Sequence, residues 1–132
     1  MDTTLGEPEV DKLISLTKTD YATGFIDNPN NMSGSKVYLF SGTDDSVVHQ
    51  DVMASLLQYY EAWIPASNIV TDFDFEAEHC IPTPDYGEAC TTLSSPYIGN
   101  CGYSGAGHAF NQLYGTEVGV GQMIDSNLFL FD

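Results

Sequence analysis

The chain has 132 residues, 42% of them hydrophobic, with eight Tyr and seven Phe. That is enough apolar material for one folded domain and argues against a disordered chain. Three Lys, no Arg and 19 Asp and Glu give a formal charge of −16, which makes nucleic acid and anionic membrane surfaces poor partners. We interpret the acidity as a solvated surface.

The first elements in chain order are a short helix and a buried strand. Apolar residues in VDKLISLTK recur at roughly helical spacing from position 10. Turn-forming residues follow as far as Ser35. The compact apolar run KVYLFSG then predicts a strand at 36–41, of the kind buried on both faces of a parallel sheet.

A second helix and a second strand follow. Apolar residues at three- and four-residue intervals predict a helix over 50–63 with one apolar face, so its aromatic side chains are expected to face the core. Pro65 closes this helix. The alternating segment NIVTDFDF predicts a strand at about 68–75, which leads into the loop that carries His79.

Strand, helix and strand form a βαβ unit, so the sequence predicts an α/β fold with parallel strands. Sites in open parallel sheets form at the carboxyl ends of the strands. The loops after Phe40 and Phe75 both lie at that edge. We therefore expect Asp45 and His79 to meet there, although they are far apart in the sequence.

Each of these two residues also has an ordinary interpretation. Asp44 and Asp45 both suit a turn that caps the following helix, and a histidine in a loop is commonly structural. A His bonded to a buried Asp can instead act as a general base. A zinc site with Glu78 and Cys80 is disfavoured, because adjacent residues cannot readily point at one ion. We expect no metal and no cofactor.

Four strings in order carry a family resemblance: KVYLFSGTDDSVV, AEHCIPTPDYGEAC, SPYIGNCGYSGAG and QLYG. From about Ala22 to near its end, the chain resembles the C-terminal part of the poly(3-hydroxybutyrate) depolymerase and related secreted esterase family. The resemblance implies a partial α/β-hydrolase fold, in which 1–132 is the C-terminal fragment of a single catalytic domain. It also implies that Asp45 is the acid and His79 the base of a serine esterase.

No serine of this chain corresponds in position to the family's nucleophile. Its serine stands in a GxSxG elbow upstream of the acid and the base, as does its oxyanion hole. The segment GYSGAG around Ser104 is similar in sequence to the elbow. However, Ser104 follows both Asp45 and His79, and Ala106 replaces the last Gly. The resemblance therefore implies that the isolated chain is inactive.

The resemblance also bears on the cysteines. The family has cysteines at the positions of Cys90 and Cys101, which implies a disulfide and an oxidising compartment. Two free thiols in a cytosolic protein are the alternative. Cys80 is expected to be a small packed side chain beside the base rather than a nucleophile. His49 and His108 have no partner visible in the sequence.

The expected function is ester hydrolysis outside the cell, on an ester polymer or a small ester, by a parent protein of which this chain is part. The N-terminus MDTTLGEPEV has no signal-peptide pattern, so this location is an expectation for the parent. A feruloyl or acetyl-xylan-type esterase is the alternative within the enzymes. A non-catalytic polymer-binding or interaction module is the alternative outside them, with loop tyrosines as candidate contacts: Tyr86, Tyr97 and Tyr103.

Both ends of the chain look cut when set beside the family, which continues past a segment similar to LFLFD. The strand at 36–41 would then expose an apolar edge. Because such an edge pairs readily with another chain, we expect the fragment to self-associate despite its charge.

Overall fold

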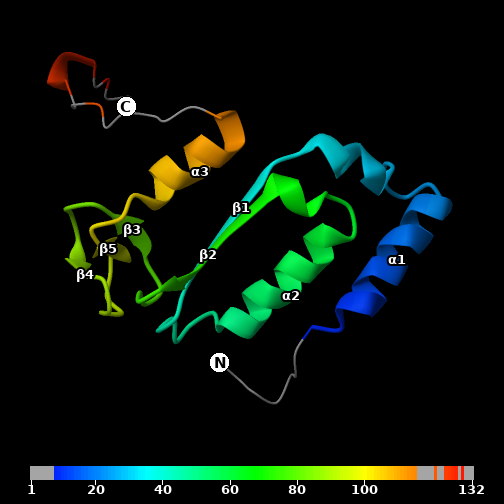
Figure 1. Cartoon of the computed structure of the whole chain (residues 1–132), viewed down its shortest axis with the longest axis horizontal. Coiled ribbons are helices and arrows are strands. Elements are labelled where there is room, and N and C mark those ends of the chain that lie inside the picture. Colours follow the sequence, from blue (N-terminus) through cyan, green and yellow to red (C-terminus); the bar gives the residue numbers. More distant parts are fainter. Residues whose placement is uncertain (1–7, 116–120, 122–123, 128, 130–132) are drawn as a thin grey trace.

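The structure, a computed structural model, describes residues 8–115, 121, 124–127 and 129. Most of MDTTLGEPEV and of LFLFD therefore lies outside the described residues. The elements in chain order are α1 (Val10–Ala22), η2 (Pro29–Gly34), β1 (Val37–Gly42), α2 (Gln50–Glu61), η3 (Ala66–Asn68), β2 (Ile69–Phe75), β3 (Ile81–Thr83), β4 (Glu88–Ala89), β5 (Ile98–Asn100), α3 (Gly105–Tyr114) and η4 (Asp125–Asn127), as Figure 1 shows. No helix among the described residues is long and apolar enough to cross a membrane.

Strands β1 and β2 form a two-stranded parallel sheet connected through α2, which confirms the expected α/β class and βαβ unit. Val37 pairs with Ile69 at one end and Phe40 with Asp72 further along. Helix α2 ends at Glu61, two residues before the expected boundary. The N–H groups of Trp63 and Ile64 both bond to the Tyr60 carbonyl, which turns the chain before Pro65 is reached.

Helices α2 and α3 lie on opposite sides of this strand pair, and α1 packs beyond α2 (Figure 1). Gln50 at the start of α2 donates from Nε2 to the carbonyls of Ser41 and Phe73, at 3.1 and 2.6 Å, and so fixes the helix to both strands. The outer contact includes a hydrogen bond of 2.8 Å between the hydroxyls of Thr17 and Tyr59. The result is a layered unit of helix, sheet, helix and helix.

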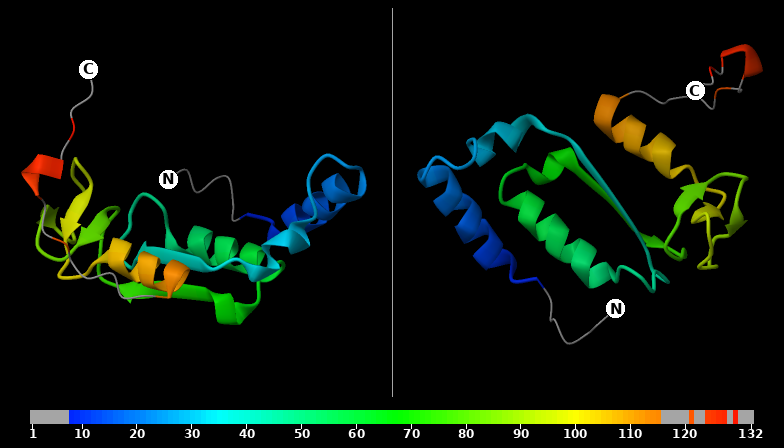
Figure 2. Two further views of the ribbon diagram at one scale, coloured as in Figure 1. Left: turned by 90° about the horizontal axis from the view of Figure 1, so that it is seen from above. Right: turned by 180° about the vertical axis from the view of Figure 1, so that it is seen from behind.

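The sequence does not predict the second sheet, which follows β2 in the chain. Three short parallel strands form a second sheet in the order β3, β5, β4, at the end of the molecule away from α1 (Figure 2). Strands of two or three residues carry no readable alternation. Helix α3 does have end signals: Ser104 caps it by accepting the Gly107 N–H at 3.1 Å, and Gly115 closes it at φ 69°.

The apolar core of the described residues is small. The buried apolar side chains are Val10, Leu39, Trp63, Ile64 and Ala77. Trp63 thus faces the core as expected. The burial expected for 36–41 on both faces is only partial, because Val37, Tyr38 and Phe40 stay half-exposed in a sheet of two strands. Large apolar side chains are also exposed on α1 and α3, among them Leu16 and Phe110.

The carboxyl ends of β1 and β2 are held together by a close backbone approach. A Cβ on Gly42 would lie 1.9 Å from the Ala77 carbonyl oxygen, so only glycine fits there. The next N–H groups cross to the other loop: Thr43 donates to the Phe75 carbonyl at 2.8 Å and Asp44 to the Ala77 carbonyl at 3.2 Å. The two loops after the strands are thereby fixed to one another.

We predict that Gly42→Ala destabilises the chain by about 3 kcal/mol, since a buried methyl group would have to displace backbone. The measurement is the urea midpoint of unfolding. Gly34→Ala is the matched control, because a Cβ at that position meets no atom within 4 Å. Equal midpoints for the two variants would contradict the prediction.

Candidate active site

Asp45 and His79 meet at the carboxyl edge of the sheet. Asp45 Oδ2 lies 3.1 Å from His79 Nδ1, while Oδ1 accepts the N–H groups of Val47 and Val48 at 2.9 and 2.7 Å. The carboxylate is therefore held at both oxygens. The Asp45 side chain is 11% exposed and the His79 side chain 43% exposed, so the carboxylate is sheltered and the imidazole is accessible.

The Asp45 carboxylate organises its own turn through Val47 and Val48 and also bonds to the histidine. It does not cap α2, whose first residue is preceded by His49. Asp44 is exposed, and its side chain accepts only the neighbouring Thr43 hydroxyl, at 3.4 Å. The structure therefore distinguishes the two aspartates that the sequence left in competition.

Glu78 is a third residue of this site, considered from the sequence only as a weak zinc ligand. Its Oε2 accepts the N–H of His79 at 2.9 Å and the N–H of Ser46 at 3.2 Å. One carboxylate thus connects the loop that carries Asp45 to the backbone of His79. These N–H groups hold the pKa of Glu78 below its ordinary value. No sequence signal indicates this bridge, because it depends on how the two loops are aligned.

The charge on Asp45 sets the chemistry of the pair. Partial burial raises the pKa of this carboxyl, but the Val48 N–H, His79 and the Val47 N–H together hold it below its ordinary value. Asp45 is therefore ionised at neutral pH, and it can accept a hydrogen bond from Nδ1–H of His79 in the tautomer that carries its proton on that nitrogen. The lone pair then lies on Nε2, which is the arrangement of a general base.

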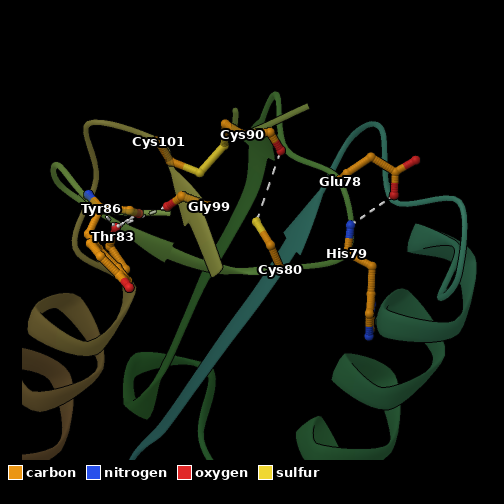
Figure 3. Close-up of a disulfide and its surroundings, with 8 residues drawn as sticks. All are labelled: Glu78, His79, Cys80, Thr83, Tyr86, Cys90, Gly99 and Cys101. Atoms are coloured by element: carbon orange, nitrogen blue, oxygen red, sulfur yellow. Dashed lines mark hydrogen bonds between the residues drawn. A yellow bond between two sulfur atoms is a disulfide. The ribbon is translucent and has the colours of Figure 1, made fainter. Parts of the chain in front are cut away.

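Cys90 and Cys101 form a disulfide with Cα atoms 4.8 Å apart, which ties β4 to β5 (Figure 3). Cys80 is a free, half-buried thiol between this disulfide and His79. Burial, together with the charges of Asp45 and Glu78, raises the pKa of the Cys80 thiol. The thiol is therefore neutral at neutral pH and a weak nucleophile.

The three cysteines are the one group of the described residues whose ligand atoms cluster as a metal site requires, all within 4.8 Å of one another. Two of these sulfurs are bonded to each other. The remaining thiol is a single ligand, so the cluster does not fit a metal ion.

A cavity of about 530 Å³ borders the imidazole. Its lining residues are Val47, His79, Cys80, Ile81, Leu93, Pro96 and Tyr97. Among the three loop tyrosines considered as contacts, Tyr97 lines this cavity, with its ring centroid 6.4 Å from that of His79. A second apolar groove, of about 540 Å³, lies between α1 and α2 and does not include the Asp45 and His79 pair.

Tyr103 lies in a different cluster from the one expected. Its ring packs against those of Phe40 and Phe75, with centroids at 5.8 and 4.8 Å, and its hydroxyl bonds to Asp72. Asp72 Oδ2 also accepts the Tyr38 hydroxyl at 2.9 Å and lies 3.4 Å from His108 Nδ1. His108 therefore has a partner that the sequence did not reveal. Tyr86 is exposed and does not line the cavity beside His79.

The parallel strands between helices, with an Asp–His pair on successive strand ends, define part of an α/β-hydrolase fold. No protein-family model matches the chain. A poly(3-hydroxybutyrate) depolymerase of Delftia acidovorans is 49% identical over 104 residues, 79% of this chain and 21% of that protein. A polyhydroxybutyrate depolymerase of Talaromyces funiculosus is 33% identical over 89 residues, 65% of this chain and 26% of that protein.

Solved structures agree with these sequence matches. The crystal structure of PHB depolymerase from Penicillium funiculosum aligns with a TM-score of 0.76 at 29% identity, over 84% of this chain and 36% of that one. A serine-to-alanine variant of PHB depolymerase, complexed with an R3HB trimer, aligns with a TM-score of 0.77 at the same identity and coverage. The chain thus matches part of proteins of the poly(3-hydroxybutyrate) depolymerase family, and it spans about a quarter of its curated relatives' length.

Acidification should lower the free energy of unfolding of the chain through protonation of Asp45. Because the folded pKa of this carboxyl is lowered, its contribution to stability is full above the ordinary aspartate value of 3.8 and is lost as the pH falls through the lowered value. Asp45→Asn should flatten this part of the curve of unfolding free energy against pH, measured with urea between pH 6 and pH 3. Asp44→Asn is the matched control and should leave the curve unchanged. Identical slopes for the wild type and Asp45→Asn would refute this assignment.

Proposed function

We propose that this chain supplies the acid, Asp45, and the base, His79, of a serine ester hydrolase of the depolymerase type. The observation that carries the proposal is the bond of 3.1 Å between Asp45 Oδ2 and His79 Nδ1 at the ends of parallel strands. The matches to poly(3-hydroxybutyrate) depolymerases support the same assignment. The residues 1–132 are then the C-terminal part of one catalytic domain.

The chemistry is acyl transfer. A serine outside the described residues attacks the ester carbonyl, and His79 Nε2 takes the serine proton. His79 then returns this proton to the leaving alcohol as the C–O bond breaks. Asp45 keeps the imidazole in the required tautomer and stabilises its charged form, while backbone donors on the same segment as the serine bind the oxyanion. The chain by itself is expected to be inactive.

The substrate we propose is an ester polymer or a small ester of the same chemistry. The relatives are named poly(3-hydroxybutyrate) depolymerases, and one solved relative holds an R3HB trimer. A feruloyl or acetyl-xylan-type esterase would use the same Asp–His geometry, since a fold does not fix a substrate. We further propose that the parent works outside the cell, which the disulfide supports because such bonds persist in oxidising surroundings.

A graft tests the catalytic proposal. We predict that the Delftia depolymerase keeps ester hydrolysis when this chain replaces its matching 104-residue region. In the graft, His79→Ala or Asp45→Ala should each lower kcat by about 10⁴-fold or more. The measurement is turnover of p-nitrophenyl butyrate and release of soluble product from polyester film.

The control variant for the graft is His49→Ala, because His49 is exposed and its side chain makes no cap hydrogen bond to α2. Its kcat should stay within about twofold of the graft, as expected for surface substitutions. A graft that binds polyester film equally well with and without both catalytic substitutions, and hydrolyses nothing, would favour the non-catalytic binding module.

The chain alone should self-associate. Its small core leaves large apolar side chains in solvent, with Leu13 44% and Leu16 51% exposed on α1. Static light scattering should therefore report oligomers, and Leu13→Ser with Leu16→Ser should shift the distribution toward monomer. Lys18→Ser, an exposed polar change on the same helix, is the control. A wild-type chain that is monodisperse and monomeric would refute this expectation.

A further inference from the structure

Glu78 lies where the two loops of the site diverge. The backbone bonds between these loops end before Asp45 on one loop and before Glu78 on the other. Among the described residues, two hydrogen bonds join the loops beyond that point. One is the bond between Asp45 and His79, and the other runs from the Ser46 N–H to Glu78. Glu78 therefore provides the connection that uses neither of the reacting side chains.

The Glu78 carboxylate holds the backbone next to both reacting residues. Its Oε2 accepts the N–H of His79 at 2.9 Å and the N–H of Ser46 at 3.2 Å. The Ser46 N–H belongs to the peptide group that follows Asp45, and the His79 N–H to the peptide group that precedes the imidazole. Two peptide groups, one beside each reacting side chain, thus lie against a single oxygen atom. This contact limits how far the two side chains can move apart.

Glu78 is itself held in place and does not contact the imidazole. Its own N–H donates to the Cys90 carbonyl at 2.9 Å, directly after β4 and at one end of the disulfide. Figure 3 shows the Glu78 carboxylate turned toward the backbone nitrogen of His79, while the His79 ring points away from it. The disulfide-bonded segment therefore supports Glu78, and Glu78 acts on the Asp45–His79 pair through the backbone alone.

The pair needs such support because it lies in loops open to solvent. The His79 side chain is 43% exposed. Ser46 and Val47, which follow Asp45, are exposed as well. Water competes for hydrogen bonds in such surroundings, so the bond of 3.1 Å between Asp45 and His79 does not by itself fix two loops. Alignment matters here, since a misplacement of about 1 Å in a catalytic site can cost about 10²-fold in rate.

Glu78 stays ionised although a second carboxylate is near. The N–H groups of His79 and Ser46 hold the pKa of Glu78 below its ordinary value, against the charge of Asp45, which raises it. An ionised oxygen makes stronger hydrogen bonds with N–H groups than a neutral one does. The contacts with the two peptide groups therefore decide where this carboxylate lies, in spite of the repulsion from Asp45.

We propose that Glu78 is a positioning residue of the esterase, which keeps Asp45 and His79 in the alignment that proton transfer requires. The inference rests on the proposed function and deepens it. Glu78 neither gives nor takes a proton: His79 Nε2 takes the serine proton and returns it to the leaving alcohol, as before. Glu78 does not line the cavity beside His79. Its effect should therefore appear in kcat and not in KM.

Two conservative variants of the Delftia graft separate alignment from charge. Glu78→Gln keeps an oxygen at the same reach without the charge, and its kcat for p-nitrophenyl butyrate should stay within about threefold of the graft. Glu78→Asp keeps the charge but is too short to reach both N–H groups. Its kcat should fall by about tenfold or more, with KM within about twofold. Glu76→Ala removes an exposed carboxylate from the same loop and is the matched control, with kcat within about twofold.

The order of the two variants decides the matter. A kcat for Glu78→Asp equal to that of Glu76→Ala would overturn the proposal, as would a loss confined to KM. A Glu78→Gln variant slower than Glu78→Asp would assign the effect to the charge and would overturn the positioning role as well. The urea midpoint of each graft is measured alongside, so that a loss of folding is recognised as such.

NMR on the full chain tests the alignment without catalysis. The ring nitrogen shifts of neutral His79 report its tautomer, and Asp45 selects the form protonated at Nδ1. In Glu78→Asp the population should move toward the Nε2-protonated form that free imidazole favours. Exchange of the Ser46 N–H with solvent should become about tenfold faster. The Thr43 N–H, which bonds to β2, is the internal control and should keep its rate.

The two measurements also distinguish this proposal from the catalytic one. An inactive graft, together with a full chain that shows these spectral changes in Glu78→Asp, would refute the catalytic role and leave Glu78 as the residue that aligns the pair. An active graft in which Glu78→Asp keeps the wild-type kcat, tautomer and exchange rate would overturn the positioning role and leave catalysis standing.

Discussion

The candidate site depends on one steric constraint, the contact between Gly42 and the Ala77 carbonyl. Parallel strands are about 4.8 Å apart, so residues that leave their ends can diverge freely unless something joins them. Here the missing side chain at Gly42 lets the loop after β2 lie directly on the end of β1. Asp45 follows Gly42 by three residues, and His79 follows Ala77 by two. The Asp45–His79 bond is thus a short-range consequence of a backbone contact.

Hydrogen bonds to two carboxylates then fix the loop after β1 and the loop after β2 relative to one another. Asp45 uses one oxygen to build its own turn and the other to hold His79. Glu78 adds a second connection between the same loops through the N–H groups of Ser46 and His79. Because both carboxylates have lowered pKa values, both are ionised at neutral pH. A base near a surface can therefore be positioned without a large core beneath it.

The sequence predicted the βαβ unit because its signals are periodic and long: the apolar run before Gly42, the helical stripe after Gln50 and the alternation before Glu76. The meeting of Asp45 and His79 followed from the rule that parallel strands share a carboxyl edge. The β3–β5–β4 sheet was missed because its strands are too short for any pattern. Tyr103 was named as a candidate contact near His79, but it bonds to Asp72 on β2 instead, a long-range pairing that no sequence pattern indicates.

The same negative charges act differently on two neighbouring groups. In the proposed acyl transfer they would stabilise the imidazolium that forms when His79 takes the serine proton. Together with burial they raise the pKa of the Cys80 thiol, so the most nucleophilic side chain near the cavity stays neutral. The carboxylate pair of Asp45 and Glu78 therefore both aligns the histidine and keeps the neighbouring thiol protonated.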